Sequence, residues 1–327
     1  MLELDNGILR VQVNEELGGE VFSITANGKN FLASYDWNSP VPATKSRSYG
    51  NARLDWLSDY RGGWQVLFPN AGNDATVEGV PLPFHGEFCR TKVEVVEHSA
   101  TKLVIAAGTR IPLVLTRTYS LLPGESVLLI EQQVSNDSDL EWPFIWGEHP
   151  AFSLPPGSKI NMPVGPVTAD LNDAGLLQDI SIGAKGSWPL LKSKAGSEVD
   201  LSTVPDGGVE RLYYLHDRPE GWVAMTHGTD LIGLAWDLQA FPHMWMWQEI
   251  QGPSFPWFGR SAITALEPAS TWPSYGLDAA IKNGQAFAIK PGEKKSSWIT
   301  FALSGLGANA VSEVSNIDQS GNFTITK

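Results

Sequence analysis

Short segments rich in β-branched and aromatic residues recur along the whole chain and limit its possible folds more than any other feature. Such segments are typical of β-strands, and each is too short for a core helix. Clear examples are residues 8–13, 93–96, 103–107, 127–134, 222–226 and 298–303. The breaks between segments carry Asn-Gly, Pro-Gly and Asp-Gly-Gly sequences, which join antiparallel neighbours. The pattern therefore predicts an all-β protein with antiparallel strands.

One hairpin is predicted in particular detail. Residues 118–122 and 126–134 both alternate apolar and polar side chains over part of their length, as strands with one buried face do. Pro123-Gly124 lies between them and supplies a turn. We expect these two segments to pair.

The segment 155–208 has a different character, with scattered proline, glycine, lysine and aspartate and little periodicity. It is either a long surface excursion or a linker. The excursion is favoured because strand-like sequence resumes afterwards without a signal for a new domain. Since 327 residues can form one large β domain, we expect a single domain over residues 1–327.

The net charge of -13 at pH 7 makes non-specific attraction to nucleic acid or to an anionic membrane unfavourable. The chain shows no basic region followed by an apolar stretch at its amino end, and no run of about 18 apolar residues. We expect a cytoplasmic protein, monomeric or homodimeric, whose partner is a neutral small molecule rather than nucleic acid or a membrane.

Several common catalytic and cofactor motifs are absent from the sequence. There is no GxxxxGK[ST] phosphate loop, no GxSxG nucleophile elbow and no HExxH zinc motif. The single cysteine, Cys89, excludes an intramolecular disulfide and a multi-thiolate metal site. The six histidines form no closely spaced set that would support a metal site, so we expect no metal.

Three segments combine ionisable residues with glycine, proline or aromatic neighbours. His85 precedes a glycine and is either a turn residue or a functional one, and His149 is either a satisfied core histidine or functional. Glu267 directly follows the apolar run 262–266, which places a carboxylate at the end of a predicted strand. Burial there is costly unless the group is paired or catalytic, and the alternative is a salt bridge at the rim.

These segments, in this order, resemble the aldose 1-epimerase (galactose mutarotase) family over most of the chain. The motifs that carry the resemblance are Leu17-Gly18-Gly19-Glu20, Phe68-Pro69 followed by His85-Gly86, Glu148-His149-Pro150-Ala151-Phe152, Leu266-Glu267-Pro268 and Lys290-Pro291-Gly292-Glu293. The resemblance implies a large antiparallel β-sandwich, the galactose mutarotase-like supersandwich. It also implies an enzyme that interconverts the α and β anomers of a free aldose without a cofactor.

By the same resemblance, Glu267 is the general base, His149 the general acid, and His85 a residue that orients the sugar and stabilises charge. Opening a pyranose removes the proton of the anomeric hydroxyl while the ring oxygen accepts one, so a carboxylate and an imidazolium on opposite sides of the sugar can act together. We expect burial to raise the pKa of Glu267, and the neighbouring Glu148 to keep His149 protonated.

Further substrate contacts are predicted at several positions. The Asn-Arg pair of galactose-type members is missing, and Asn70, Asn73 or Arg61 is expected to replace it. Asp237 is the candidate for the aspartate that contacts sugar hydroxyls. Arg90 resembles the phosphate-binding arginines of the hexose-phosphate branch of the family.

The segment 243–249 alternates so that Trp245, Trp247 and Glu249 share one strand face. Indole rings pack well on the apolar faces of sugars, and this makes Trp247 a candidate contact. The same alternation also fits a packed core strand.

Other functions remain open from the residues alone. A non-catalytic carbohydrate-binding protein could use the same architecture and the same tryptophans, and a hexose-phosphate 1-epimerase is a close variant. A glycoside hydrolase or polysaccharide lyase would need two carboxylates, with Glu249 as the possible partner of Glu267. The combination of His85, His149 and Glu267 favours the aldose 1-epimerase.

Overall fold

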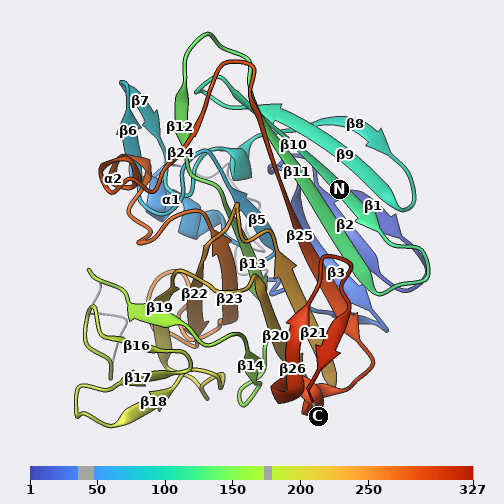
Figure 1. Ribbon diagram of the computed structural model, residues 1–327, viewed down its shortest axis with the longest axis vertical. Coiled ribbons are helices and arrows are strands. Elements are labelled where there is room, and N and C mark those ends of the chain that lie inside the picture. The colour runs from blue at the N-terminus through green and yellow to red at the C-terminus, as the bar shows by residue number, and fades with distance from the viewer. Residues whose placement is uncertain (36–47, 173–178, 327) are drawn as a thin grey trace.

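Two large antiparallel sheets dominate the computed structural model, which describes residues 1–35, 48–172 and 179–326 (Figure 1). The larger sheet runs in the order β1 (Leu2–Asp5), β2 (Arg10–Asn14), β3 (Glu20–Ala26), β5 (Trp64–Leu67), β13 (Gly147–Phe152), β23 (Ala262–Ala269), β22 (His243–Ile250), β19 (Val209–Leu215), β15 (Pro166–Ala169), β16 (Lys185–Ser187), β17 (Leu190–Lys192) and β18 (Glu198–Asp200), with β4 (Lys29–Asn30) paired to β3. The smaller sheet runs β14 (Ile160–Asn161), β20 (Trp222–His227), β21 (Asp230–Trp236), β25 (Lys294–Ser304), β11 (Val127–Asn136), β10 (Leu113–Leu121), β9 (Lys102–Gly108) and β8 (Glu94–His98).

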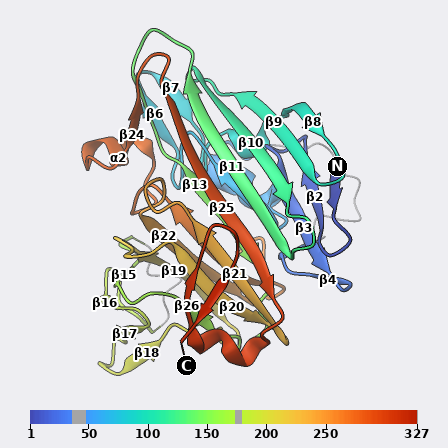
Figure 2. The same cartoon turned by 45° about the vertical axis from the view of Figure 1, so that its right-hand side comes forward.

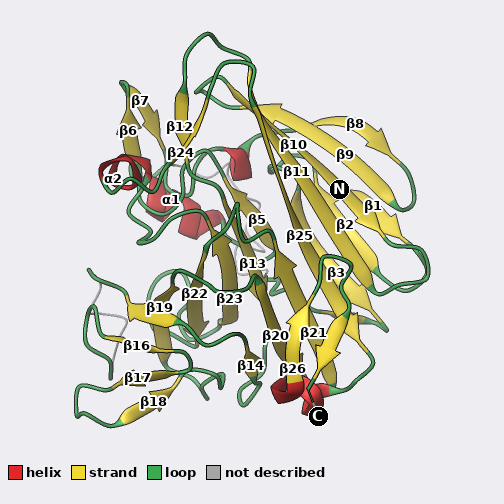
Figure 3. Ribbon diagram, in the orientation of Figure 1, coloured by secondary structure: helices red, strands yellow, loops and turns green. Residues whose placement is uncertain are grey.

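The remaining elements are short. Two-stranded ribbons are formed by β6 (Ala75–Val77) with β7 (Val80–Leu82), β12 (Trp142–Phe144) with β24 (Phe287–Ile289), and β26 (Val314–Ile317) with β27 (Phe323–Ile325). The described helices are α1 (Ala52–Asp59), α2 (Leu277–Lys282) and the 3₁₀ segments Phe88–Arg90 and Ala308–Glu313 (Figure 3). None of these helices is long and apolar enough to cross a membrane.

The structure confirms the all-β class and each of the strands predicted above. The predicted hairpin is formed by β10 and β11, which pair in register from Leu113 opposite Asn136 to Leu121 opposite Leu128. Gly124 has a φ of 74°, a conformation that its turn requires and that glycine adopts without strain. Side chains on β10 alternate strictly between buried and half-buried, so one face of the strand enters the core.

The sandwich core lies between the two sheets. Figure 2 shows β10, β11 and β25 as long neighbouring strands of the smaller sheet, and their inward side chains pack against β2, β3, β5 and β13 of the larger one. Across this core the Tyr119 hydroxyl donates a hydrogen bond of 2.5 Å to the Gly19 carbonyl oxygen. One face of the larger sheet therefore packs in the core, and its other face points away from the core.

The other face of the larger sheet is covered in part by α1, which the sequence analysis did not predict. Asn51 caps this helix, because its side chain accepts a hydrogen bond of 2.9 Å from the Leu54 backbone N–H. Trp56 and Tyr60 pack from the helix onto Ala151 and Ala265 of the sheet. The helix thereby forms one wall of the cavity described below.

The segment 155–208 contributes strands to both sheets. β14 pairs with β20 in the smaller sheet, β15 pairs with β19 in the larger sheet, and β16, β17 and β18 extend the larger sheet beyond it. Residues 173–178 of this segment lie outside the described residues. The segment thus supplies the far edge of the sheet face that carries the cavity.

Candidate active site

A cavity of about 320 Å³ opens on the face of the larger sheet that points away from the sandwich core. Its floor is formed by side chains of β13, β23, β22 and β19, and its walls by α1 and by loops. The lining residues are Arg53, Trp56, Leu57, Gly72, Asn73, Phe84, His85, His149, Asp170, Asn172, Glu210, Leu212, Trp245, Trp247, Glu267, Ser274 and Tyr275.

His149 and Glu267 lie next to each other on this floor. β13 and β23 pair Gly147 with Ala269 and Ala151 with Ala265, so His149 and Glu267 are cross-strand neighbours. The Nε2 atom of His149 is 3.6 Å from Oε1 of Glu267, and each side chain is almost completely buried. The two side chains therefore lie side by side on one floor. Glu267 also lies within β23 rather than at its end.

Burial controls the charge of this pair. It raises the pKa of Glu267 well above its usual value and lowers the pKa of His149 to about 4. Both shifts favour the neutral forms, a protonated Glu267 carboxyl group and an unprotonated His149 ring. The pair then holds one proton, on Glu267, and its Oε1 lies 3.6 Å from Nε2 of His149.

Glu148 does not hold His149 protonated, which corrects the sequence-based expectation. Successive side chains of a strand point to opposite faces, and that of Glu148 enters the sandwich core. There Arg117 donates two hydrogen bonds to its carboxylate, at 3.0 and 3.2 Å, and Trp64 donates one at 2.6 Å. Glu148 is thus the partner of a buried arginine.

His85 lies at the edge of the cavity, in a segment where the backbone has positive φ values and approaches a neighbouring segment closely. Its φ is 62°, and its Nδ1 accepts a hydrogen bond of 3.1 Å from the Gly72 N–H. A Cβ on the following residue, Gly86, would lie 2.4 Å from the Phe68 carbonyl oxygen, so only glycine fits there. Burial, then the nearby His149, lowers the pKa of His85 well below its usual value. A neutral ring whose Nδ1 accepts must carry its proton on Nε2, and that N–H is the donor available to a ligand.

Aromatic rings surround His149 beside Glu267. The ring of His149 meets the rings of Trp56, Tyr60 and Trp247 at centroid distances of 5.5, 5.6 and 5.8 Å. Trp247 is half-buried and lines the cavity. Trp245 is fully buried, and its Nε1 donates a hydrogen bond of 2.8 Å to the Thr271 carbonyl oxygen.

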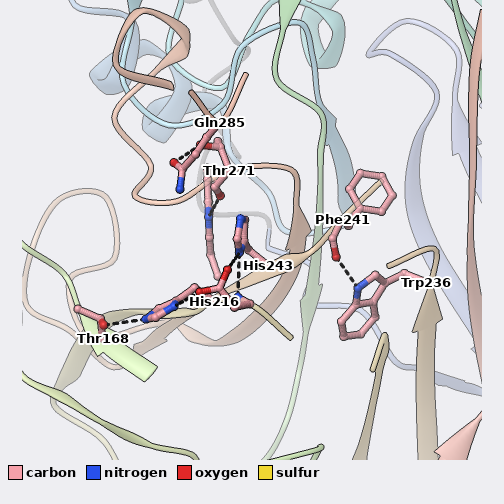
Figure 4. Close-up of polar contacts among 9 residues, drawn as sticks. Thr168, His216, Trp236, Phe241, His243, Thr271 and Gln285 are labelled. Carbon is pink, nitrogen blue, oxygen red and sulfur yellow. Dashed lines mark hydrogen bonds and ion pairs between the residues drawn. The ribbon is translucent and has the colours of Figure 1, made fainter. Parts of the chain in front are cut away.

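Hydrogen bonds beyond the cavity fix the strand ends and loops that shape it (Figure 4). The Thr271 hydroxyl bonds to the Gln285 side chain at 3.1 Å, and Nε2 of His216 lies 3.1 Å from the Thr168 hydroxyl. The ring of His216 also stacks on Trp272 at a centroid distance of 4.0 Å. These contacts hold the end of β19 against β15 and against the chain that follows β23.

The structure brings five of the eight predicted site residues to the cavity and leaves three outside it. Asn73 lines the cavity with His85, His149, Trp247 and Glu267. Asp237, the candidate sugar contact, does not line this cavity. It caps a turn after β21 and accepts a hydrogen bond of 2.9 Å from the Gln239 N–H. It borders a separate cavity with Trp146 and Phe287.

Arg61 and Arg90 are the other two predicted contacts outside the lining. The guanidinium of Arg61 lies near the buried Glu20 carboxyl group, where it counters the rise in pKa that burial causes. Arg90 is exposed and donates to the Ala52 carbonyl oxygen at 3.5 Å. Asn70 is buried and bonds to backbone atoms, including the Leu277 N–H, so it supports the loop rather than facing a ligand.

Sequence reasoning missed several lining residues. Arg53 and Trp56 are three positions apart on α1, and the Asn51 cap was the signal that could have revealed that helix. Asp170, Asn172 and Glu210 come from a stretch without periodicity and the strand after it, and no local pattern marks them. Among the described residues, no group of three or more histidine, cysteine, aspartate or glutamate side chains is arranged to hold a metal ion.

Glu249 does not form a catalytic pair with Glu267. It lies four positions along β22 from Trp245, the cross-strand partner of Glu267, so the two backbone positions are separated by about 13 Å along the sheet. Glycoside hydrolases need about 5 to 9.5 Å between theirs. Glu249 instead accepts hydrogen bonds of 2.7 Å from the Gly252 N–H and the Ser261 hydroxyl.

Solved structures with this architecture provide the comparison. A provisionally assigned aldose 1-epimerase from Escherichia coli K12 superimposes with a TM-score of 0.66 at 17% identity, covering 93% of this chain and 98% of that one. Galactose mutarotase-like proteins from Lactobacillus casei and Clostridium acetobutylicum give TM-scores of 0.57 and 0.60 at 18% and 14% identity. They cover 93% and 92% of this chain and 100% and 94% of their own.

These likenesses show that the chain has the galactose mutarotase-like β-sandwich fold, as the sequence resemblance implied. No family sequence model matches the chain, and no curated protein is similar to it in sequence. The comparison therefore defines the fold, and the activity has to be argued from the cavity.

Proposed function

We propose that the protein is an aldose 1-epimerase, which opens the ring of a free aldose and closes it to the other anomer. The observation that carries this proposal is the buried contact of 3.6 Å between His149 Nε2 and Glu267 Oε1 on the cavity floor, with His85 beside it. A non-catalytic sugar-binding site has no need for two buried ionisable groups, because burying them costs free energy.

The reaction needs two proton transfers at one carbon of the sugar. The anomeric hydroxyl oxygen and the ring oxygen are both bonded to that carbon, so neighbouring groups on one floor can reach both. In the reactive form the one proton of the pair has passed from Glu267 to His149. Glu267 then accepts the hydroxyl proton while His149 donates its proton to the ring oxygen, and the bond between the anomeric carbon and the ring oxygen breaks as the carbonyl forms. Rotation about the bond between the first two carbons, followed by the reverse transfers, yields the other anomer.

The remaining lining residues orient the sugar. The Nε2–H of His85 donates to a sugar oxygen and stabilises negative charge as it develops. Trp247 offers an apolar surface to one face of the ring. No electrons and no chemical group leave the sugar, so acid/base chemistry accounts for the whole conversion.

Anomer exchange measured by NMR or polarimetry tests the proposal. Freshly dissolved glucose, galactose and hexose 6-phosphates should be compared, with the rate without enzyme subtracted for each sugar. We expect acceleration of exchange for neutral aldoses. Binding of sugars without acceleration would instead identify a carbohydrate-binding protein, and a strict requirement for phosphate would identify a hexose-phosphate 1-epimerase.

The pH dependence of kcat/KM follows from the shared proton. The pair is active while it holds one transferable proton, so kcat/KM rises with pH through the lowered pKa of His149, about 4. It stays level and then falls as pH passes the raised pKa of Glu267. The profile is measured with the buffer-catalysed rate subtracted at every pH. An acid limb near 6.5, the usual pKa of histidine, would contradict this description of the site.

A further inference from the structure

The cavity continues well beyond the catalytic pair. From Glu267 on β23 it extends across β22 and β19 to Asp170, which directly follows β15 and whose N–H bonds to the Leu212 carbonyl oxygen. Three strand spacings separate β23 from β15, a distance of about 14 Å. This is more than twice the width of one pyranose ring, so a monosaccharide bound at Glu267 and His149 leaves the far part of the cavity unfilled.

The far end of the cavity is polar, and hydrogen bonds hold its side chains in place. Asp170 is almost fully buried, and its carboxylate accepts hydrogen bonds of 2.6 Å from the Tyr214 hydroxyl and 2.8 Å from the Asn172 N–H. Tyr275 lies beside it, where burial and then the Asp170 carboxylate raise the pKa of its phenol to about 12. A phenol that stays protonated can donate a hydrogen bond as well as accept one. Such fixed donors and acceptors suit hydroxyl groups.

The floor between the two ends is apolar. Leu212 on β19 lies directly opposite Trp247 on β22, and both line the cavity. An apolar floor with polar groups at one edge matches a sugar ring, which has apolar faces and a polar rim.

We infer that this far end, formed by Asp170, Asn172, Glu210, Leu212 and Tyr275, is a second subsite that holds the non-reducing ring of a neutral disaccharide while the reducing ring lies at Glu267 and His149. The inference rests on the proposed function and narrows its substrate class to sugars that carry a glycosyl substituent and keep a free anomeric carbon.

The distribution of charge favours a neutral occupant. Asp170 and Glu210 place two carboxyl groups at the far end, which repel a phosphate or a carboxylate. Arg53, the cation among the described lining residues, is near the catalytic end, where it contributes to lowering the pKa of His85. An anionic group would therefore meet no cationic side chain among the described residues of the second subsite.

The test compares kcat/KM for anomer exchange at the reducing ends of maltose, cellobiose and lactose with the values for glucose and galactose. Hydrogen bonds to charged groups are worth about 10- to 100-fold in affinity, so the wild-type protein should prefer at least one disaccharide by about that factor. In Asp170→Asn the ratio of disaccharide to monosaccharide kcat/KM should fall about tenfold, mainly through KM. Glu210→Gln should lower the same ratio. It replaces Asp170→Asn as the test variant if Asp170→Asn does not fold.

Asp206→Asn is the matched control, because Asp206 is an exposed carboxylate outside the cavity. Its ratio should equal that of the wild type. Equal kcat/KM for disaccharides and monosaccharides in the wild type would overturn the second subsite while leaving the epimerase proposal in place. The second subsite would also be overturned if Asp170→Asn lowered kcat/KM equally for disaccharides and monosaccharides. A preference of the wild type for hexose 6-phosphates would overturn it as well. Absence of acceleration for every sugar would overturn both proposals.

Discussion

Replacement of Glu267 by glutamine is expected to lower kcat/KM for anomer exchange by about 10²- to 10⁴-fold. Glutamine has nearly the same shape and fills the same buried position beside His149, but its amide cannot accept the proton of the anomeric hydroxyl. His149→Asn should cause a loss of similar size, because the ring oxygen then has no proton donor. The two groups act as one unit, so the double variant should lose little more than either single variant.

Asp237→Asn supplies the control for this experiment. The sequence suggests Asp237 as a substrate contact, but the structure places it outside the cavity at a turn after β21. The Asp237→Asn variant should retain the wild-type kcat/KM. Sugar binding should be measured on each variant, since retained binding with lost turnover separates a catalytic defect from misfolding. Full activity in Glu267→Gln would remove the basis of the proposed function.

Breaking the buried ion pair between Arg117 and Glu148 is expected to lower the free energy of unfolding much more than breaking an exposed ion pair. Arg117 on β10 and Glu148 on β13 join the two sheets across the core, and both side chains are almost wholly buried. Removing one partner leaves an uncompensated charge in a medium of low polarity. Arg117→Met should therefore lower the free energy of unfolding by about 3 to 5 kcal/mol, measured by urea denaturation.

A double-mutant cycle shows whether the pair itself is responsible. Combining Arg117→Met with Glu148→Gln removes both charges and keeps an acceptor for the Trp64 N–H, so the double variant should be more stable than Arg117→Met alone. Lys102→Met breaks the half-exposed pair with Glu97 and should cost at most about 1 kcal/mol. Equal losses for the buried and the exposed pair would show that Arg117 and Glu148 do not stabilise the sandwich in this way.

Local patterns in the sequence were sufficient to predict the fold class. Strand alternation depends only on which side chains face the core, so segments such as 127–134 reveal themselves without knowledge of their partners. The β10–β11 hairpin was predictable because its strands are joined by one short turn. The order of the short motifs also led to His149, Glu267 and His85, which the structure brings together around one cavity.

Long-range strand pairing decided the rest. The contact between His149 and Glu267 depends on the register of β13 against β23, and that register joins residues more than a hundred positions apart. The same pairing turns Glu148 into the core and away from His149, although the two are adjacent in sequence.

Asp237 and Asp170 show the difference most clearly. Both are single aspartates that follow a strand, and the sequence offered a family resemblance only for the first. The sheet order places β15 beside β19 on the cavity face, so Asp170 lines the cavity and Asp237 does not. The sequence by itself determined the all-β class, several of the strands and, through the family resemblance, the sandwich fold and the candidate acid/base residues, because those follow from local pattern and motif. The tertiary structure alone decided the extent and chemistry of the cavity, because strand order and register bring distant residues onto one face.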